Sequence, residues 1–198
     1  VRVSVVDALV RHVFSMACET LYHFAWVVVC VWFLELAKVQ FGGDDEARSS
    51  DRAGYTRLVL GHVLDVVLRM LHPVVPFVTE TLWVALTGRE SLVVADWPTD
   101  VAPSADVEVS VRRVSDAQNL ATEIRRFRSD QGLKPGQRVP ARLTRTDDAD
   151  LPADLLEQVT SLARLTPAEE DFTATASLEV RLGLSTVGVE IDTSGTIA

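Results

Sequence analysis

Cysteine and lysine are scarce in this sequence of 198 residues, and several classes of protein are excluded by what it lacks. Its two cysteines, Cys18 and Cys30, stand in apolar surroundings and give neither a disulfide framework nor the spacing of a metal site. We expect both to be buried, reduced thiols of a cytoplasmic protein.

No signal peptide is expected, because no basic region precedes a short apolar core with a small-residue cleavage site. The chain does not begin with methionine, so we expect a fragment of a longer protein. The longest uninterrupted apolar run covers residues 24–34, well below the ~20 residues that cross a bilayer. A buried helix and no membrane partner are expected, with an amphipathic membrane contact as the minor alternative.

Catalytic motifs are also missing. The sequence has no glycine-rich phosphate loop and no Ser-His-Asp arrangement, and its histidines lack metal-ligand spacing. We interpret His62 and His72 as structural residues. The chain alone is therefore expected to have no catalytic residue, no metal site and no enzymatic activity, although an unrecognised enzyme remains the weakest of the alternatives.

Apolar residues, which make up 47% of the chain, recur at helical spacing in its first half. They predict one helix over residues 1–40, a second over 55–71 that ends at Pro73 and Pro76, and a third over 77–86 that ends at Gly88. Paired glycines and polar residues predict a loop between the first two. Residues 1–96 are thus expected to form an antiparallel helical bundle.

Tryptophan side chains in this half have two interpretations. All four could stack nucleic-acid bases, namely Trp26, Trp32, Trp83 and Trp97, but the helical spacing of the first three among valines favours a place in the core.

The second half mixes helix and strand. Two prolines and no periodicity predict a linker over residues 97–106. A small α/β subdomain with about three strands is then expected over 107–198, and the whole chain is predicted to be mainly α. Its predicted elements are a long helix over 107–131 that ends at Gly132, a strand over 138–145, a short helix over 152–165, and a hairpin over 177–182 and 187–192.

The net charge of -9 argues against a nucleic-acid partner, but the charge is unevenly distributed. Residues 112–145 hold nine basic and three acidic residues, a balance of +6, which leaves -15 on the remaining 164 residues. This segment is either a phosphate-binding surface or a solvated face paired with acids. Its candidate phosphate ligands are Arg125, Arg126, Arg128, Lys134 and Arg138.

Five motifs stand out along the chain, namely LYHFAW at 21–26, WFLELAK at 32–38, LHPVVPFVTETLW at 71–83, SLVVADWP at 91–98 and IRRFRSDQGLKPGQRVP at 124–140. In order and spacing they resemble a region of the valyl-tRNA synthetases, which are class I aminoacyl-tRNA synthetases. The resemblance covers nearly the whole chain and implies an anticodon-binding helical domain with the region that follows it.

The resemblance implies tRNA, and tRNA(Val) in particular, as a partner, together with a catalytic domain of the same enzyme. That domain's His-Ile-Gly-His and Lys-Met-Ser-Lys-Ser signatures do not occur here. ATP and magnesium would belong to it, and no cofactor is expected in this chain. Because tRNA carries phosphates, the resemblance favours the phosphate-binding interpretation of the basic segment over that of a solvated face.

One motif departs from the family. Residues 26–33 read WVVVCVWF where these synthetases have Trp-Asp-Glu-Phe-Cys-Asp-Trp-Tyr, so Val27, Val28 and Val31 replace three acids. On a helix these three valines share one face, and burial against a partner would stabilise it. The face is a candidate homodimer or partner surface, a modified stretch, or a repacked part of the bundle. The alternative function is therefore a degenerate stand-alone relative that acts through protein association.

Overall fold

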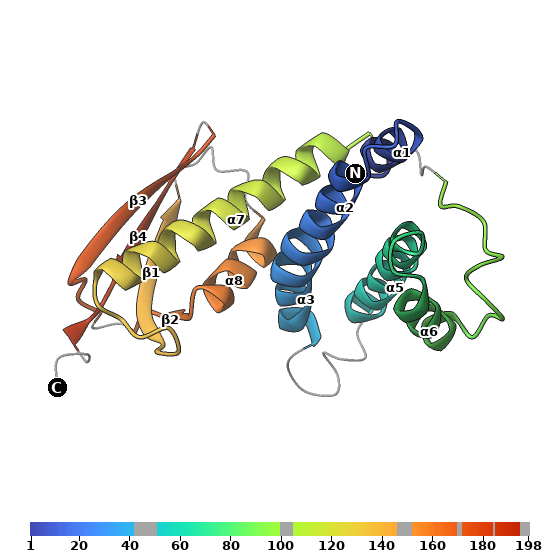
Figure 1. Cartoon of the computed structure of the whole chain (residues 1–198). Coiled ribbons are helices and arrows are strands. Elements are labelled where there is room, and N and C mark those ends of the chain that lie inside the picture. The colour runs from blue at the N-terminus through green and yellow to red at the C-terminus, as the bar shows by residue number, and fades with distance from the viewer. Residues whose placement is uncertain (42–50, 100–104, 146–151, 170–171, 184, 195–198) are drawn as a thin grey trace. The chain divides into compact units, whose positions relative to one another are not determined.

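The computed structural model describes residues 1–41, 51–99, 105–145, 152–169, 172–183 and 185–194. The chain forms two compact units, Val1–Ala102 and Pro103–Ala198 (Figure 1). The described part of the first unit is helical, and that of the second combines helices with a four-stranded sheet. The loop expected between the first two predicted helices and residues 100–104 of the expected linker lie outside the described residues.

The first helix ends much earlier than predicted. α1 (Arg2–Val10) is followed by His12, whose φ of 59° is left-handed. The N–H of His12 donates to the Leu9 carbonyl at 3.1 Å. The N–H of Val13 donates to the Ala8 carbonyl at 2.8 Å, which completes a Schellman motif. The prediction of one helix up to residue 40 is wrong here, because histidine occupies a position where the usual stop signal is glycine.

Three helical segments then follow without a break, namely α2 (Phe14–His23), η1 (Phe24–Phe33) and α3 (Leu34–Phe41). η1 is a π-helix, whose hydrogen bonds reach one residue further back than those of an α-helix. At its end the N–H of Leu34 donates to the carbonyl of Val29. The apolar run predicts a helix here, but no feature of the sequence predicts the wider π form.

Most of this continuous helix lies outside the core, which corrects the expectation of a buried helix. By length and composition alone, Phe14–Lys38 is long and apolar enough to cross a membrane. Only 17% of its apolar 18-residue stretch is buried inside the protein. α1 packs against α2, and α5 packs against α2 and α3, so neighbours cover only part of its circumference. Ala17 and Leu21 are buried on the covered side.

Several expectations about individual side chains change for the same reason. Trp26 is 56% exposed and Trp32 is half-buried, so the prediction of a core side chain fails for Trp26. Trp83 is buried as predicted. Cys30 is exposed and Cys18 is half-buried, so the prediction of two buried thiols is also wrong.

The next two helices agree with the prediction. α5 (Asp51–Leu71) and α6 (Pro76–Thr87) begin slightly before the expected residues. Pro76 stands in the first turn of α6, where its missing N–H costs no hydrogen bond. α6 ends at Gly88, whose φ of 68° is the left-handed conformation that glycine adopts without a steric penalty.

A small apolar cluster holds α1, α2 and α5 together. Its members are at most 3% exposed, and Val66 and Leu71 of α5 pack against it. The cluster consists of Val5, Ala8, Ala17, Leu21 and Met70.

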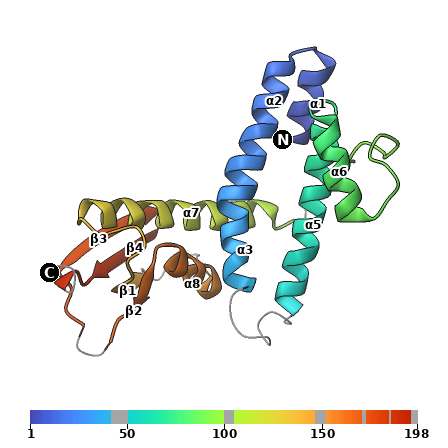
Figure 2. The ribbon, with the colours of Figure 1, turned by 60° about the horizontal axis from the view of Figure 1, so that its bottom comes forward.

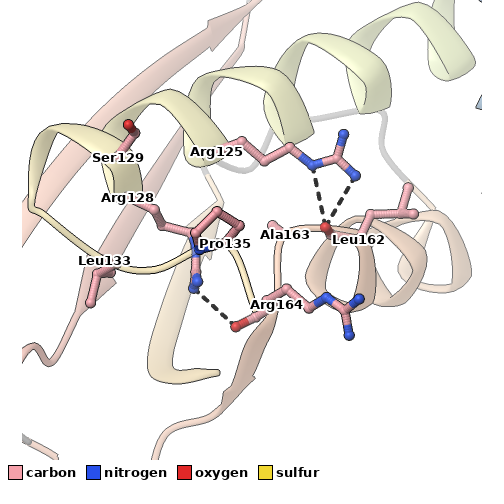
Figure 3. Close-up of a pocket in the computed structure, with 8 residues that line it drawn as sticks. All are labelled: Arg125, Arg128, Ser129, Leu133, Pro135, Leu162, Ala163 and Arg164. Carbon is pink, nitrogen blue, oxygen red and sulfur yellow. Dashed lines mark hydrogen bonds between the residues drawn. The ribbon is translucent and has the colours of Figure 1, made fainter. Parts of the chain in front are cut away.

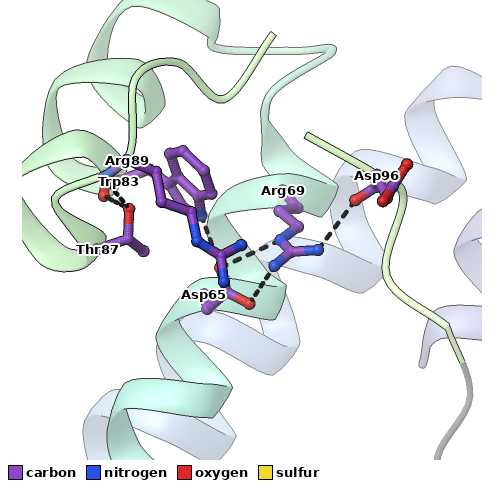
Figure 4. A network of polar contacts seen from close by, with 6 residues as sticks. All are labelled: Asp65, Arg69, Trp83, Thr87, Arg89 and Asp96. Carbon is purple, nitrogen blue, oxygen red and sulfur yellow. Dashed lines mark hydrogen bonds and ion pairs between the residues drawn. The ribbon is translucent and has the colours of Figure 1, made fainter. Parts of the chain in front are cut away.

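Trp83 joins α6 to α5 through a polar network (Figure 4). Its side chain is 1% exposed, and its indole Nε1 donates a hydrogen bond of 2.6 Å to Oδ1 of Asp65. Nε and Nη2 of Arg69 donate to Oδ1 and Oδ2 of the same carboxylate at 3.1 and 2.8 Å. Nη1 of Arg69 donates to the Asp96 carbonyl at 3.0 Å, and the Arg89 guanidinium lies 5.9 Å from the Trp83 ring. The network therefore also fixes the segment that follows α6.

The residues between α5 and α6 explain why His72 is structural. Nδ1 of His72 lies 2.8 Å from Oγ1 of Thr79, and that hydroxyl is also 2.9 Å from the carbonyl of Val75. A hydroxyl has one proton, so when Thr79 donates to the carbonyl, His72 is the donor to its oxygen. On the next residue, Oε2 of Glu80 accepts the N–H of Leu92 at 2.9 Å.

In the second unit, α7 (Val107–Asp130) confirms the predicted long helix and its end. Gly132 has a φ of 74°, and its N–H donates to the Ser129 carbonyl at 3.0 Å. The apolar stripe of this helix is buried only from Ala117 onward. Its exposed residues are Val107, Val111 and Val114, and its buried ones include Ala117, Ala121 and Ile124.

The sheet has the order β2-β1-β4-β3, one strand more than expected. Its strands are β1 (Val139–Arg145), β2 (Leu165–Pro167), β3 (Ala176–Leu182) and β4 (Ser185–Ile191). β3 and β4 form the predicted antiparallel hairpin, and β1 pairs with β4 antiparallel and with β2 parallel. β2 was not predicted, because three residues carry no periodicity and the expected short helix extended over its start.

The helices of this unit pack on the sheet and on each other (Figure 2). α8 (Ala153–Leu162) lies between β1 and the parallel strand β2 in the chain, because parallel neighbours need a crossover connection, usually a helix. α8 also packs against α7. α7 packs against β3. The inward residues of β4, Val187, Val189 and Ile191, are fully buried.

Candidate nucleic-acid interface

All five predicted phosphate ligands lie in the second unit. Three stand on the last turns of α7 and the other two in the loop between α7 and β1. Four side chains are exposed and that of Arg128 is buried. The exposed ones are Arg125, Arg126, Lys134 and Arg138.

Arg128 fixes the end of α7 to the strands. Its side chain is 5% exposed. Nη1 donates to the Arg164 carbonyl at 3.0 Å, and Nη2 donates to the Gln137 carbonyl. Burial lowers the pKa of Arg128, and the positive charge of Arg164 lowers it further. These backbone bonds make Arg128 a residue that positions the basic segment, and its contact with tRNA stays a prediction.

Arg125 holds the end of α8 against α7 (Figure 3). Its Nε and Nη2 donate to the Leu162 carbonyl at 3.3 and 3.2 Å, where a cation also stabilises the negative end of the helix dipole. Between α7 and α8 lies a cavity of about 380 Å³, which Arg125, Arg128 and Arg164 line together. Arg164 was missed by sequence reasoning, because the fold brings it to the basic segment from 36 residues further along the chain.

The other three predicted ligands are available to a polyanion. Within the described ranges, Arg126, Lys134 and Arg138 form no ion pair and no hydrogen bond through their side chains. The alternative of a basic face paired with acids is therefore not supported at these positions.

An exposed pair of aromatic rings lies at the junction of α2 and η1. Tyr22 and Trp26 are 65% and 56% exposed. Their rings are parallel within 5°, with centroids 6.4 Å apart. Such rings offer a flat surface on which an unpaired nucleic-acid base can stack. The helical spacing of the tryptophans favoured burial and gave no signal for this pair.

Val27, Val28 and Val31, the candidate partner surface, lie in the π-helix next to this pair. Val28 and Val31 are each 40% exposed, and Val27 is half-buried. Val28 also lines a cavity of about 310 Å³ with His23 and Phe24. The structure thus leaves a partly exposed apolar surface at these positions.

The described residues contain no group of three or more His, Cys, Asp or Glu side chains that could hold a metal ion.

Comparisons with known proteins identify the same region as the sequence motifs. A family model described as the anticodon-binding domain of tRNA ligase matches residues 3–143. Valine--tRNA ligase of Nocardia farcinica is 60% identical over 93% of this chain. Those of Mycobacterium leprae and Corynebacterium diphtheriae are 54% and 53% identical over the whole chain. The chain spans 20 to 22% of the length of these curated relatives.

Proposed function

Because the chain belongs to the family of anticodon-binding domains of tRNA ligases, we propose that it binds the anticodon region of tRNA, and that its ligand is tRNA(Val). The resemblance to valyl-tRNA synthetases that the motifs predict is confirmed. Binding would position the tRNA for aminoacylation by a catalytic domain outside this chain. In this proposal that domain holds the ATP and magnesium, and the protein acts in the cytoplasm.

The observation that carries the proposal is the exposed Tyr22–Trp26 pair within the residues matched by the family model. Anticodon bases are unpaired, so they can be splayed out and stacked on aromatic rings. The packing of α5 against α2 and α3 supports the further proposal that the first unit is an antiparallel bundle of the anticodon-binding kind. In this arrangement the helices fix the aromatic pair, and the basic residues of the second unit neutralise phosphates.

Replacing Trp26 by alanine tests the stacking role. We expect weaker binding of a tRNA(Val) anticodon stem-loop by about 1–3 kcal/mol, because one base loses its stacking partner. Trp26→Phe should restore most of the affinity, since phenylalanine keeps an aromatic face. Fluorescence anisotropy with a labelled stem-loop measures both variants.

Tyr55→Ala is the matched control, because Tyr55 is an exposed aromatic residue of the same unit at 72% exposure. We expect it to bind as the wild type does. Equal affinity of Trp26→Ala and the wild type would exclude Trp26 from base binding.

A second candidate function is protein association through the Val27, Val28 and Val31 surface, as in a degenerate stand-alone relative. The exposure of Val28 and Val31 favours it, since covering apolar area stabilises a complex. Analytical ultracentrifugation should then show a dimer or larger complex that Val28→Asp dissociates. A monomer whose sedimentation Val28→Asp leaves unchanged argues against self-association.

A further inference from the structure

The cavity between α7 and α8 gathers three arginine side chains (Figure 3). Arg125, Arg128 and Ser129 line it from α7, and Leu162 and Arg164 line it from the end of α8. None of its lining residues is acidic. Its volume of about 380 Å³ is ample for a phosphate group and its ester substituents.

The three arginines differ in the hydrogen bonds that their side chains already form. Arg128 is buried and donates to two backbone carbonyls, and Arg125 donates to the carbonyl at the end of α8. Arg164 is exposed, and within the described part of the chain its guanidinium has no hydrogen bond and no ion pair. The positive charge of Arg164 repels that of Arg128 and helps to lower the pKa of Arg128. An anion in the cavity would relieve this repulsion.

The backbone of Arg164 is unusual. Its φ is 56°, and its N–H donates to the Ser161 carbonyl at 3.1 Å, so it occupies the left-handed position after a helix where glycine is favoured. A residue with a long cationic side chain therefore holds a strained backbone conformation at the edge of a cavity. Backbone strain of this kind is concentrated at active sites and ligand-binding sites.

We propose that this cavity binds a phosphodiester group of the tRNA backbone, with the Arg164 guanidinium as the principal donor and Arg125 beside it. The assignment rests on the proposed function. It adds Arg164, a phosphate-binding residue that lies outside the basic segment. A planar guanidinium donates two parallel hydrogen bonds to phosphate oxygens. A polymer fits better than free phosphate, because two more exposed cations, Arg126 on α7 and Lys134 in the loop after it, are close in the chain to the residues that line the cavity.

Arg164→Gly tests the assignment without endangering the fold. Glycine accepts the left-handed backbone, so we expect the thermal unfolding midpoint to stay the same or rise. In a filter-binding titration of the 198-residue chain with a tRNA(Val) transcript, the affinity should fall several-fold. The slope of log affinity against log salt should decrease by about 0.7–0.9, as expected for the loss of one phosphate contact. Arg164→Lys should recover part of the affinity.

Arg181→Ala is the matched control, since Arg181 is an exposed arginine on β3 of the same unit, and it should bind with wild-type affinity and slope. Wild-type affinity and slope in Arg164→Gly would overturn the assignment and leave the proposed function standing. Failure of the wild type to bind tRNA would overturn both. If inorganic phosphate alone shifts the Arg164 side-chain NMR signal while Arg164→Gly leaves tRNA binding unchanged, the cavity takes free phosphate and the assignment to RNA is wrong.

Discussion

Replacing Trp83 by alanine is expected to lower the free energy of unfolding of the first unit by about 3–5 kcal/mol, the cost of truncating a large buried aromatic side chain. Trp83 is 1% exposed, and its indole donates to Asp65, which also binds Arg69. Removing it leaves a cavity between α5 and α6 and takes one donor from a partly buried carboxylate. The effect should therefore lie at the upper end of what single substitutions cause.

Tryptophan fluorescence during urea unfolding measures this effect selectively, because all four tryptophans stand before residue 103 and report on the first unit. Trp97→Ala is the control, since Trp97 is 38% exposed, and it should cost far less. A Trp83→Ala chain that unfolds at the wild-type urea concentration would contradict the role given to the network.

The second large effect concerns charge. Replacing Arg126, Lys134 and Arg138 together by alanine should weaken tRNA binding by about 3 kcal/mol, if each exposed contact with phosphate contributes roughly 1 kcal/mol. The affinity should fall about a hundredfold. The slope of log affinity against log salt should fall by about two to three, because fewer counterions are released. Filter binding over a series of salt concentrations measures both quantities.

The control triple Arg11→Ala, Lys38→Ala and Arg181→Ala changes the net charge equally, at exposed positions outside the basic segment. It should keep most of the affinity and slope. If both triples lose the same affinity, the net charge of the chain rather than a local surface governs binding.

Helix ends show where the sequence was informative and where it was not. Gly88 and Gly132 end α6 and α7 as predicted, because glycine adopts a positive φ without a steric penalty. His12 and Arg164 adopt the same conformation and end α1 and α8. Neither residue signals a helix end in a sequence, so the first helix was predicted too long and the last was extended into β2.

Exposure was the least predictable property. Apolar periodicity places a side chain on one face of a helix, but it does not say whether another element covers that face. Trp26 and Cys30 were expected inside for this reason, and they are exposed. The motif at 71–83 was recognised as a resemblance, while the pairing of Trp83 with Asp65 became visible only in the fold.

The candidate site was predictable in part. Counting charges along the chain located the basic segment, which the net charge of -9 conceals. Charge counting did not distinguish the buried Arg128 from the exposed Arg126. It also did not predict that Arg164 lines a cavity together with Arg128. Contacts between residues 36 positions apart depend on the path of the chain through β1 and α8.

The most direct test of the central claim is a competition between two tRNA(Val) transcripts for this chain, one with its own anticodon and one with all three anticodon bases replaced. Binding to phosphates alone would treat the two transcripts equally, since their backbones are identical. The account predicts that the transcript with the native anticodon competes at least tenfold better, a difference of about 1.4 kcal/mol. Equal competition by both transcripts would contradict anticodon recognition by this chain.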